Sequence, residues 1–288
     1  MQRCEEIPVI WLQASTCSGC SVSVLNSVNP AISSLLLDEV LPGKHINLRF
    51  QATVMAGAWE PVLEVLKAAE KELDGQYVLV VEGCIPTADN GKFGTIGEIP
   101  IVERVASLGK AAQAVIALGT CASFGGIFSA QPNPSGGKGV GELFNAKEID
   151  TPLVNVPGCP PHPDWFVGTV ATILLAGLAG LDLDEYRRPK SFYGKLIHEN
   201  CPRRACFDEG KFAKHLSDEG CLYELGCKGT ITHADCSLRR WNNGTNWVIG
   251  SGAPCNGCVE PDFPDLVSPF YEKIPEEVLF AVEEEATQ

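Results

Sequence analysis

A Cys-x-x-Cys pair at residues 17–20 is the feature that most constrains how this chain can fold. It follows an apolar, strand-like run at residues 9–13 and precedes a helix-like run at residues 21–29. Open α/β sheets bind their ligands at the carboxyl ends of their strands, so a ligand is expected at this position. By itself the pair fits a redox dithiol, half of a zinc site, or two ligands of an iron–sulfur cluster.

Strand-like and helix-like runs alternate through residues 1–184. The expected strands are short, apolar and rich in β-branched residues, as in a parallel sheet that is buried on both faces. They span residues 9–13, 46–50, 77–82, 114–118 and 153–156. The expected helices span residues 22–37, 59–73, 99–108, 141–145 and 164–179. This alternation predicts a flavodoxin-like, doubly wound α/β domain with a parallel sheet.

Cysteines follow several of these strands. The loops after the strands carry residues 17–20, Cys84, Cys121 and Cys159. Because the carboxyl ends of parallel strands share one edge of the sheet, four of these thiols are expected to converge: Cys17, Cys20, Cys121 and Cys159. Four thiolates suit a [4Fe–4S] cluster or a tetrahedral zinc ion. The simpler alternative is that Cys121 and Cys159 are small buried hydrophobic residues.

Residues 185–288 form a different kind of region, rich in Cys, Gly, Pro and Asn and poor in apolar runs. Such a segment cannot easily build a core alone, and bound clusters would supply cross-links. One group of possible ligands is His198, Cys201, Cys221 and Cys227, and a second is Cys236, Cys255 and Cys258. Three thiolates suit a [3Fe–4S] cluster, or a [4Fe–4S] cluster with an outside ligand. Zinc fingers are the alternative for both groups, and a lone histidine is more often a hydrogen-bonded surface residue.

Composition excludes several classes of protein. The net charge of −14 argues against a nucleic-acid binder, which would carry a basic patch. Thirteen cysteines, an odd count, in a 288-residue chain with 45% hydrophobic residues do not fit a small disulfide-stapled scaffold. The longest uncharged run, residues 165–181, is slightly short for a membrane span, so we expect a buried helix and no transmembrane segment.

These motifs together resemble the small, electron-transferring subunit of nickel–iron hydrogenases over nearly the whole chain. The matching stretches are residues 17–20, 81–86, 119–126, 156–165, 198–203, 221–229, 235–247 and 254–263. Residues 9–26, 157–165 and 258–265 are most similar to the nickel–iron–selenium branch.

The resemblance implies three clusters. Cys17, Cys20, Cys121 and Cys159 would hold a proximal [4Fe–4S] cluster that faces the large subunit. His198, Cys201, Cys221 and Cys227 would hold a distal [4Fe–4S] cluster, and Cys236, Cys255 and Cys258 a medial cluster, expected to be [3Fe–4S]. The nickel–iron centre that activates H2 would belong to the large subunit of an obligate heterodimer. The external electron carrier would be a cytochrome, a ferredoxin or a membrane quinone-linked subunit.

Departures from the family pattern add further expectations. Thr16 stands where members often have Glu, and Val248 where members carry Cys or Pro. Oxygen-tolerant members have additional cysteines at the positions of Gly19 and Gly126, so ordinary oxygen sensitivity is expected here. Exported members carry a twin-arginine leader, and no twin-arginine run is found at residues 1–4. We expect a cytoplasmic protein if Met1 is the native start, and a periplasmic or membrane-associated one if a leader was removed.

Two other functions fit parts of this pattern. A related cluster subunit of a quinone-reducing respiratory complex shares the Gly-Cys-Pro-Pro loop at residues 158–161 but lacks the cysteine-rich tail. A zinc-stapled interaction protein would use the same thiols without redox chemistry. Cys4 and Cys206 have no expected role, and Cys84 is expected to contact the proximal site without binding iron.

Overall fold

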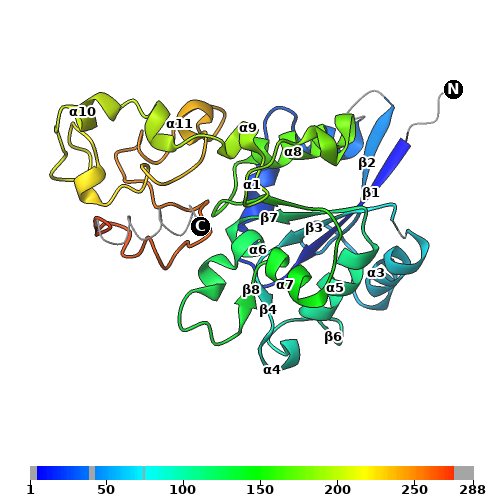
Figure 1. Ribbon diagram of the computed structural model, residues 1–288. Coiled ribbons are helices and arrows are strands. Elements are labelled where there is room, and N and C mark those ends of the chain that lie inside the picture. The colour runs from blue at the N-terminus through cyan, green and yellow to red at the C-terminus, as the bar shows by residue number, and fades with distance from the viewer. Residues whose placement is uncertain (1–4, 39–42, 74, 276–288) are drawn as a thin grey trace. The chain divides into compact units, whose positions relative to one another are not determined.

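The computed structural model describes residues 5–38, 43–73 and 75–275 (Figure 1). The chain divides into two compact units, residues 1–191 and residues 192–288. The domain boundary predicted between residues 184 and 185 stays a prediction. Cys4 lies outside the described residues.

A five-stranded parallel sheet organises the first unit. Its strands are β1 (Glu5–Gln13), β2 (Lys44–Gln51), β3 (Val78–Glu82), β7 (Ala114–Leu118) and β9 (Leu153–Val156). Their spatial order is β2-β1-β3-β7-β9, with every neighbouring pair parallel. This is the flavodoxin-like order of a doubly wound sheet. The predicted parallel α/β fold is therefore confirmed.

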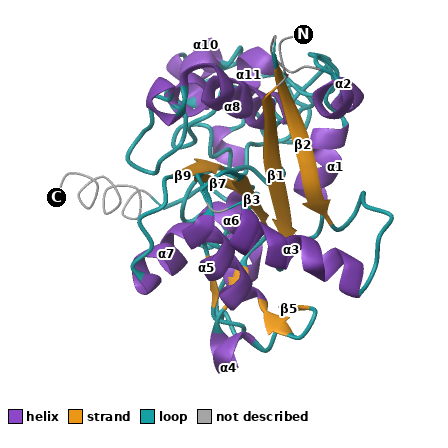
Figure 2. Ribbon diagram, turned by 90° about the vertical axis from the view of Figure 1, so that its right-hand side faces the viewer, coloured by secondary structure: helices purple, strands orange, loops and turns teal. Residues whose placement is uncertain are grey.

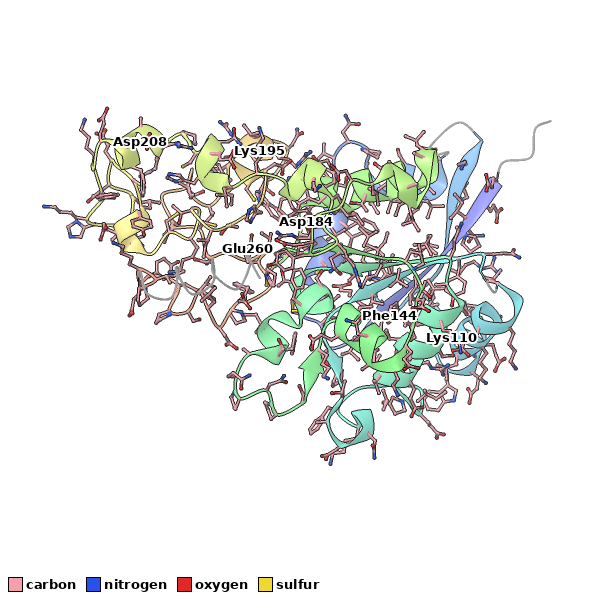
Figure 3. The ribbon with its side chains drawn as sticks, viewed as in Figure 1. Lys110, Phe144, Asp184, Lys195, Asp208 and Glu260 are labelled. Atoms are coloured by element: carbon pink, nitrogen blue, oxygen red, sulfur yellow. The ribbon has the colours of Figure 1, made fainter. Side chains whose placement is uncertain are left out.

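Helices cover both faces of this sheet (Figures 1 and 2). One face carries α3 (Glu60–Glu72), α5 (Ile101–Ala111), α6 (Thr120–Phe124) and α7 (Val140–Lys147). The other carries α1 (Gly19–Leu25), α2 (Ile32–Leu37) and α8 (Pro163–Ala176). The helices on the first face pack closely against one another. The ring of Phe144 on α7, labelled in Figure 3, lies so near Gly109 of α5 that a Cβ added to this glycine would be 2.5 Å from it. This packing fixes the strands whose ends carry the cysteines.

Two predicted helices differ from those observed. The single helix predicted for residues 22–37 is split into α1 and α2 around Pro30, whose missing N–H and fixed φ cannot continue a helix. The helix predicted for residues 164–179 ends at Gly177, where φ is +68°. A 3₁₀ turn follows at Leu178–Gly180. Among the described residues, no helix is long and apolar enough to span a membrane.

Several short elements complete the first unit. They are β4 (Ile85–Pro86), α4 (Ala88–Gly91), β5 (Thr95–Ile96), β6 (Ile99–Pro100), the 3₁₀ turn Gly126–Ser129 and β8 (Gly137–Lys138). β6 pairs with β5, so α5 begins two residues later than the predicted helix. β4 pairs with β8, which brings Cys84 beside residues 137–138.

The second unit consists of turns and short helices. These are α9 (Lys190–Tyr193) at the boundary, then η3 (Ile197–Asn200), α10 (Arg204–Asp208), η4 (Tyr223–Leu225) and α11 (Cys236–Arg239). Phe263, Val267 and Ile274 form one small buried apolar cluster in the described part of this unit. The rings of Phe263 and Phe270 stack with centroids 5.7 Å apart. Isolated packing of this size gives little stability by itself.

Candidate metal centres

The loop after β1 is curled by local hydrogen bonds. Ser18 lies in the left-handed region with φ +61°, and its N–H donates to Thr16 Oγ1 at 2.9 Å. α1 begins directly afterwards at Gly19, so Cys20 is carried on the first turn of a helix while Cys17 stands in the loop before it. Cys17 is exposed and Cys20 is half-buried. The turn thus presents both thiols at the carboxyl edge of the sheet.

Gly119, at the end of β7, approaches Cys20 closely. Its φ is +90°, and a Cβ placed on it would lie 2.4 Å from Cys20 Sγ. No side chain fits there, so glycine is required for backbone and sulfur to lie together. The next helix, α6, carries Cys121 in its first turn. Residues from the first and fourth strand ends therefore meet.

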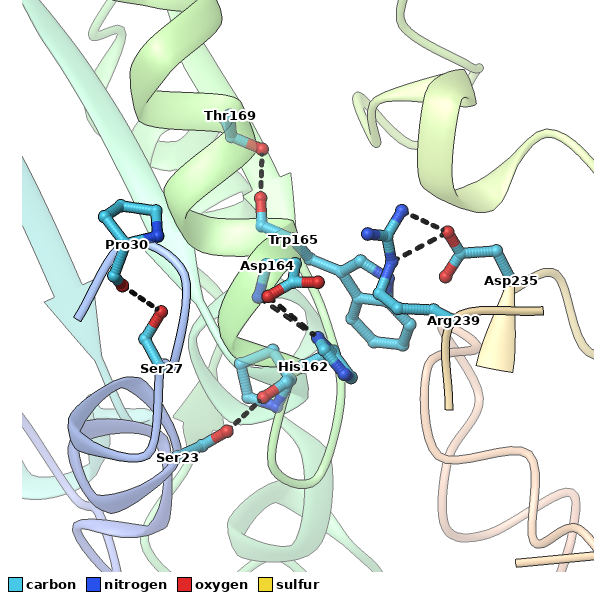
Figure 4. A network of polar contacts seen from close by, with 10 residues as sticks. Ser23, Ser27, Pro30, His162, Asp164, Trp165, Thr169, Asp235 and Arg239 are labelled. Carbon is cyan, nitrogen blue, oxygen red and sulfur yellow. Dashed lines mark hydrogen bonds and ion pairs between the residues drawn. The ribbon is translucent and has the colours of Figure 1, made fainter. Parts of the chain in front are cut away.

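The loop after β9 brings in Cys159. The Gly158 N–H donates to Thr120 Oγ1 at 2.8 Å, which ties this loop to the residue before Cys121. Ser23 of α1 donates from its hydroxyl to the Pro161 carbonyl at 2.6 Å, and the Asp164 N–H donates to His162 Nδ1 at 3.1 Å (Figure 4). These bonds hold the loop against α1 and start α8.

Electrostatics shows that these four thiols form one group. Burial raises the pKa of Cys20 well above its ordinary value, and Glu82 and the thiols of Cys121, Cys17 and Cys159 raise it further. Burial and the neighbouring Cys159 raise the pKa of Cys121 to about 11, partly offset by hydrogen bonds from the Ile127 and Phe128 backbone. Clustered thiols of this kind become thiolates when metal cations offset their mutual repulsion. The donor set therefore fits an iron–sulfur cluster.

Glu82 was not predicted as a functional residue. It ends the otherwise apolar strand β3 and is 0% exposed. Its carboxylate accepts hydrogen bonds from five donors, namely Trp11 Nε1 at 3.0 Å, Gln13 Nε2 at 3.4 Å, Thr16 Oγ1 at 3.2 Å, the Ser21 N–H at 3.2 Å and the Ser21 hydroxyl at 2.5 Å. A buried charge that is satisfied this fully is held in place. The sequence signal was one charged residue within a strand buried on both faces.

Cys84 lies beside the four-thiol group. It is fully buried, and its Sγ is 3.5 Å from the Lys138 carbonyl. Burial and the adjacent Cys121 thiol raise the pKa of Cys84 to about 12. Cys84 thus lies close to Cys121, one of the predicted proximal ligands, as expected from the sequence. The Lys138 carbonyl is positioned to accept a hydrogen bond from its thiol.

The predicted distal residues line one small cavity in the second unit. Its walls include His198, Cys201, Cys221 and Cys227. The His198 ring packs edge-on against Phe207, with centroids 4.6 Å apart. Burial and the nearby Arg204 lower the pKa of His198, which favours the neutral imidazole that binds metals. The structure thus gathers one imidazole and three thiols around a single space.

Three further thiols gather elsewhere in the second unit. Cys236 begins α11, and burial, the Cys258 thiol and Asp235 raise its pKa well above the ordinary value. Burial raises the pKa of Cys255 strongly, with contributions from Cys227 and Cys258. Arg239 pairs with Asp235 at 2.6 Å, so the carboxylate beside Cys236 is itself compensated (Figure 4). Val248 is 38% exposed between buried neighbours.

All cysteines in the described part of the chain are free thiols. No group of three or more His, Cys, Asp or Glu side chains in this part converges on the position of a single metal ion. A cluster binds each thiolate to a different iron, so its ligands need not converge on one point.

Two sequence families cover the chain in succession. Residues 17–173 match the family of the 20 kDa subunit of NADH ubiquinone oxidoreductase, and residues 193–271 match the C-terminal region of NiFe/NiFeSe hydrogenase small subunits. The periplasmic [NiFeSe] hydrogenase small subunit of Desulfomicrobium baculatum is 44% identical, over 93% of this chain and 87% of its own length.

The chain belongs to the family of NiFe and NiFeSe hydrogenase small subunits.

Other relatives agree with this membership. The periplasmic [NiFe] hydrogenase small subunit of Solidesulfovibrio fructosivorans is 43% identical, over 92% of this chain and 81% of the relative. The structure of a reduced, active Ni-Fe-Se hydrogenase from Desulfomicrobium baculatum matches with a TM-score of 0.88, 44% identity, and coverage of 93% of this chain and 100% of that one. The respiratory family matches only the first part, whereas the hydrogenase family also accounts for the cysteine-rich tail.

In this hydrogenase small subunit, Gly19 and Gly126 lie against predicted proximal ligands. A Cβ on Gly19 would lie 3.1 Å from Cys17 Sγ, and one on Gly126 would lie 2.9 Å from Cys121 Sγ. Gly126 also has φ +55°. A side chain at residue 126 would therefore crowd Cys121, and its backbone conformation would also be strained.

Proposed function

We propose that this hydrogenase small subunit relays electrons through three iron–sulfur clusters held by eleven side chains. The proximal [4Fe–4S] ligands are Cys17, Cys20, Cys121 and Cys159; the distal [4Fe–4S] ligands are His198, Cys201, Cys221 and Cys227; the medial [3Fe–4S] ligands are Cys236, Cys255 and Cys258. When bound, each cluster supplies one-electron redox chemistry. H2 oxidation or proton reduction takes place on the large subunit of the heterodimer.

The chain's own residues set the environment of these groups. Gly119 gives the backbone room beside Cys20, and the Ile127 and Phe128 N–H groups hydrogen bond to Cys121. Glu82 places a fixed negative charge next to Cys20. N–H donors and cations near sulfur favour the reduced state of a cluster, whereas nearby carboxylates disfavour it. The protein thus tunes each potential by hydrogen bonding, charge and burial.

The proximal edge supports an obligate partner. Cys17 and Cys159 are exposed, and α1 with the residues that follow it exposes the apolar side chains of Val22, Leu25 and Val28. Exposed thiolate ligands would meet water and oxygen, so a large subunit that covers this edge would protect them. Obligate interfaces of this type bury roughly 2,000–5,000 Å². The isolated small subunit should therefore lose its proximal cluster in air sooner than the heterodimer does.

Two further parts of the proposal concern the electron carrier and the compartment. His198 is one of the four proposed distal ligands, and the distal cluster would exchange electrons with a cytochrome, a ferredoxin or a membrane quinone-linked subunit. Two relatives are named as periplasmic, which supports the periplasmic alternative for this chain. Fractionation of cells that express the complete gene from its native start tests this location, and recovery with cytoplasmic markers would contradict it.

The observation that carries the proposal is the mutual interaction of four thiols from three separate loops, Cys17, Cys20, Cys121 and Cys159. The test compares Cys121→Ala with Cys84→Ala, because the two thiols lie near one another and only Cys121 is a proposed ligand. In the co-purified heterodimer, Cys121→Ala should remove the proximal paramagnetic signal and leave the medial signal. Cys84→Ala should retain all signals. Equal loss in both variants would contradict the ligand assignment.

A further inference from the structure

Lys228 is a buried cation next to residues of two of the proposed cluster sites. It follows Cys227 directly and is only 2% exposed. Its Nζ donates to the backbone carbonyl of Glu272. Gly226 holds that C-terminal segment close, since a Cβ added to Gly226 would lie 2.5 Å from the Glu272 nitrogen. The amine of Lys228 is therefore held against the backbone at Glu272.

Backbone bonds join Lys228 to the medial group as well. The Lys228 N–H donates to the Cys255 carbonyl at 2.8 Å. In return, the Cys255 N–H donates to Cys227 Sγ at 3.4 Å. The Lys228 carbonyl accepts a 2.6 Å hydrogen bond from Thr232 Oγ1, which lies 3.8 Å from Cys255 Sγ. Lys228 thus belongs to one short hydrogen-bonded unit that contains a distal and a medial residue.

A buried ammonium group is costly unless negative charge or hydrogen bonds compensate it. The acidic groups that interact electrostatically with Lys228 are the thiols of Cys227 and Cys255, together with Glu272. Two of these three are proposed ligands of different clusters. A positive charge on Lys228 would therefore interact with the negative charge of a cluster bound at Cys227 and of one bound at Cys255.

We propose that Lys228 is a positioning residue whose fixed positive charge raises the reduction potentials of the distal and medial clusters together. This inference rests on the proposed function, because it requires clusters on Cys227 and Cys255. Adding an electron to either cluster makes it more negative, and a nearby cation stabilises that state. Lys228 neither gains nor loses a proton in this role. One residue would thereby raise the potentials of two carriers in the same direction.

The test measures both midpoint potentials in the purified heterodimer by paramagnetic resonance during redox titration. Lys228→Met removes the charge but keeps a long apolar stem, and both potentials should shift downward. Lys228→Arg should restore both. Lys211→Met is the matched control, because the Lys211 side chain is 70% exposed and pairs with Glu209 at 2.7 Å. This control should leave both potentials at their wild-type values.

Lys228→Gln separates charge from anchoring, since its amide can still donate to the Glu272 carbonyl. It should shift both potentials downward as Lys228→Met does, and it carries the test if Lys228→Met does not assemble. A shift in one cluster only, or unchanged potentials in both variants, would overturn the proposal. Iron and sulfide analysis of the wild-type heterodimer tests the proposed function separately, so a failure of the clusters themselves would be recognised before any variant is compared.

Discussion

Ser21 and Glu82 are joined by two hydrogen bonds. The Ser21 hydroxyl donates to Glu82 Oε2 at 2.5 Å, and its N–H donates to Glu82 Oε1 at 3.2 Å. Ser21 directly follows Cys20, so this pair fixes a buried carboxylate beside a proposed proximal ligand. Glu82 is the second-largest cause, after burial, of the raised pKa of Cys20. The same negative charge should therefore resist reduction of a cluster bound there.

Replacing Glu82 with Gln should raise the proximal potential. The change removes one negative charge at nearly constant volume, and the shift should be on the order of tens of mV, given about 59 mV per tenfold change for one electron. Potentiometric titration of the proximal signal in the heterodimer measures it. Glu64→Gln is the control, because Glu64 is an exposed residue of α3 that pairs with Lys67. An unchanged or lower proximal potential in Glu82→Gln would refute this effect of the carboxylate.

His198→Cys should lower the distal potential and slow exchange with the external acceptor. A thiolate adds negative charge where a neutral imidazole stood, which disfavours reduction. His215→Cys serves as the control for an extra thiol, since the His215 side chain is 84% exposed. The measurements are the distal midpoint potential and turnover with an artificial acceptor. If His198→Cys matches wild type in both, His198 is not a ligand.

Val248→Cys should convert the medial cluster from [3Fe–4S] to [4Fe–4S] and lower its potential. An alkyl side chain offers no lone pair to iron, whereas a thiolate at this position would supply a fourth ligand. The oxidised wild-type heterodimer should show a [3Fe–4S] signal of about one spin per complex, which Val248→Cys should lose. Val248→Ala should keep the signal. Four irons at the wild-type medial site would show that this ligand set is incomplete.

Removal of iron should destabilise the second unit more than the first. The first unit has a large buried core on its sheet, whereas the described part of the second unit is built of turns and short helices and contains the small cluster of Phe263, Val267 and Ile274. Structural metal sites contribute directly to the free energy of folding. After anaerobic chelation, hydrogen exchange should accelerate across residues 192–275 while β3 and β7 stay protected. Equal protection of both units from hydrogen exchange after iron loss would argue against stabilisation of the second unit by its clusters.

The sheet was predictable because its strands are short apolar runs separated by helical patterns. β7 and β9 have the predicted limits. The grouping of the cysteines that follow the strands could also be predicted, since the carboxyl ends of parallel strands share one edge of the sheet. The predicted single helix at residues 22–37 is instead two helices, α1 and α2, because Pro30 interrupts the apolar periodicity. Sequence also could not reveal Lys228, because a lysine beside a cysteine carries no sign of burial. Only the fold brings residues 228, 255 and 272 together.

Mössbauer and paramagnetic resonance spectroscopy of the anaerobically purified heterodimer test the central claim most directly. The account predicts a brown protein with two [4Fe–4S] clusters and one [3Fe–4S] cluster in addition to the large-subunit metal centre. Cys121→Ala, Cys201→Ala and Cys236→Ala should each diminish a different one of the three signals. A colourless small subunit with zinc in place of iron and sulfide, or one signal lost in all three variants, would contradict an electron relay built on three separate ligand groups.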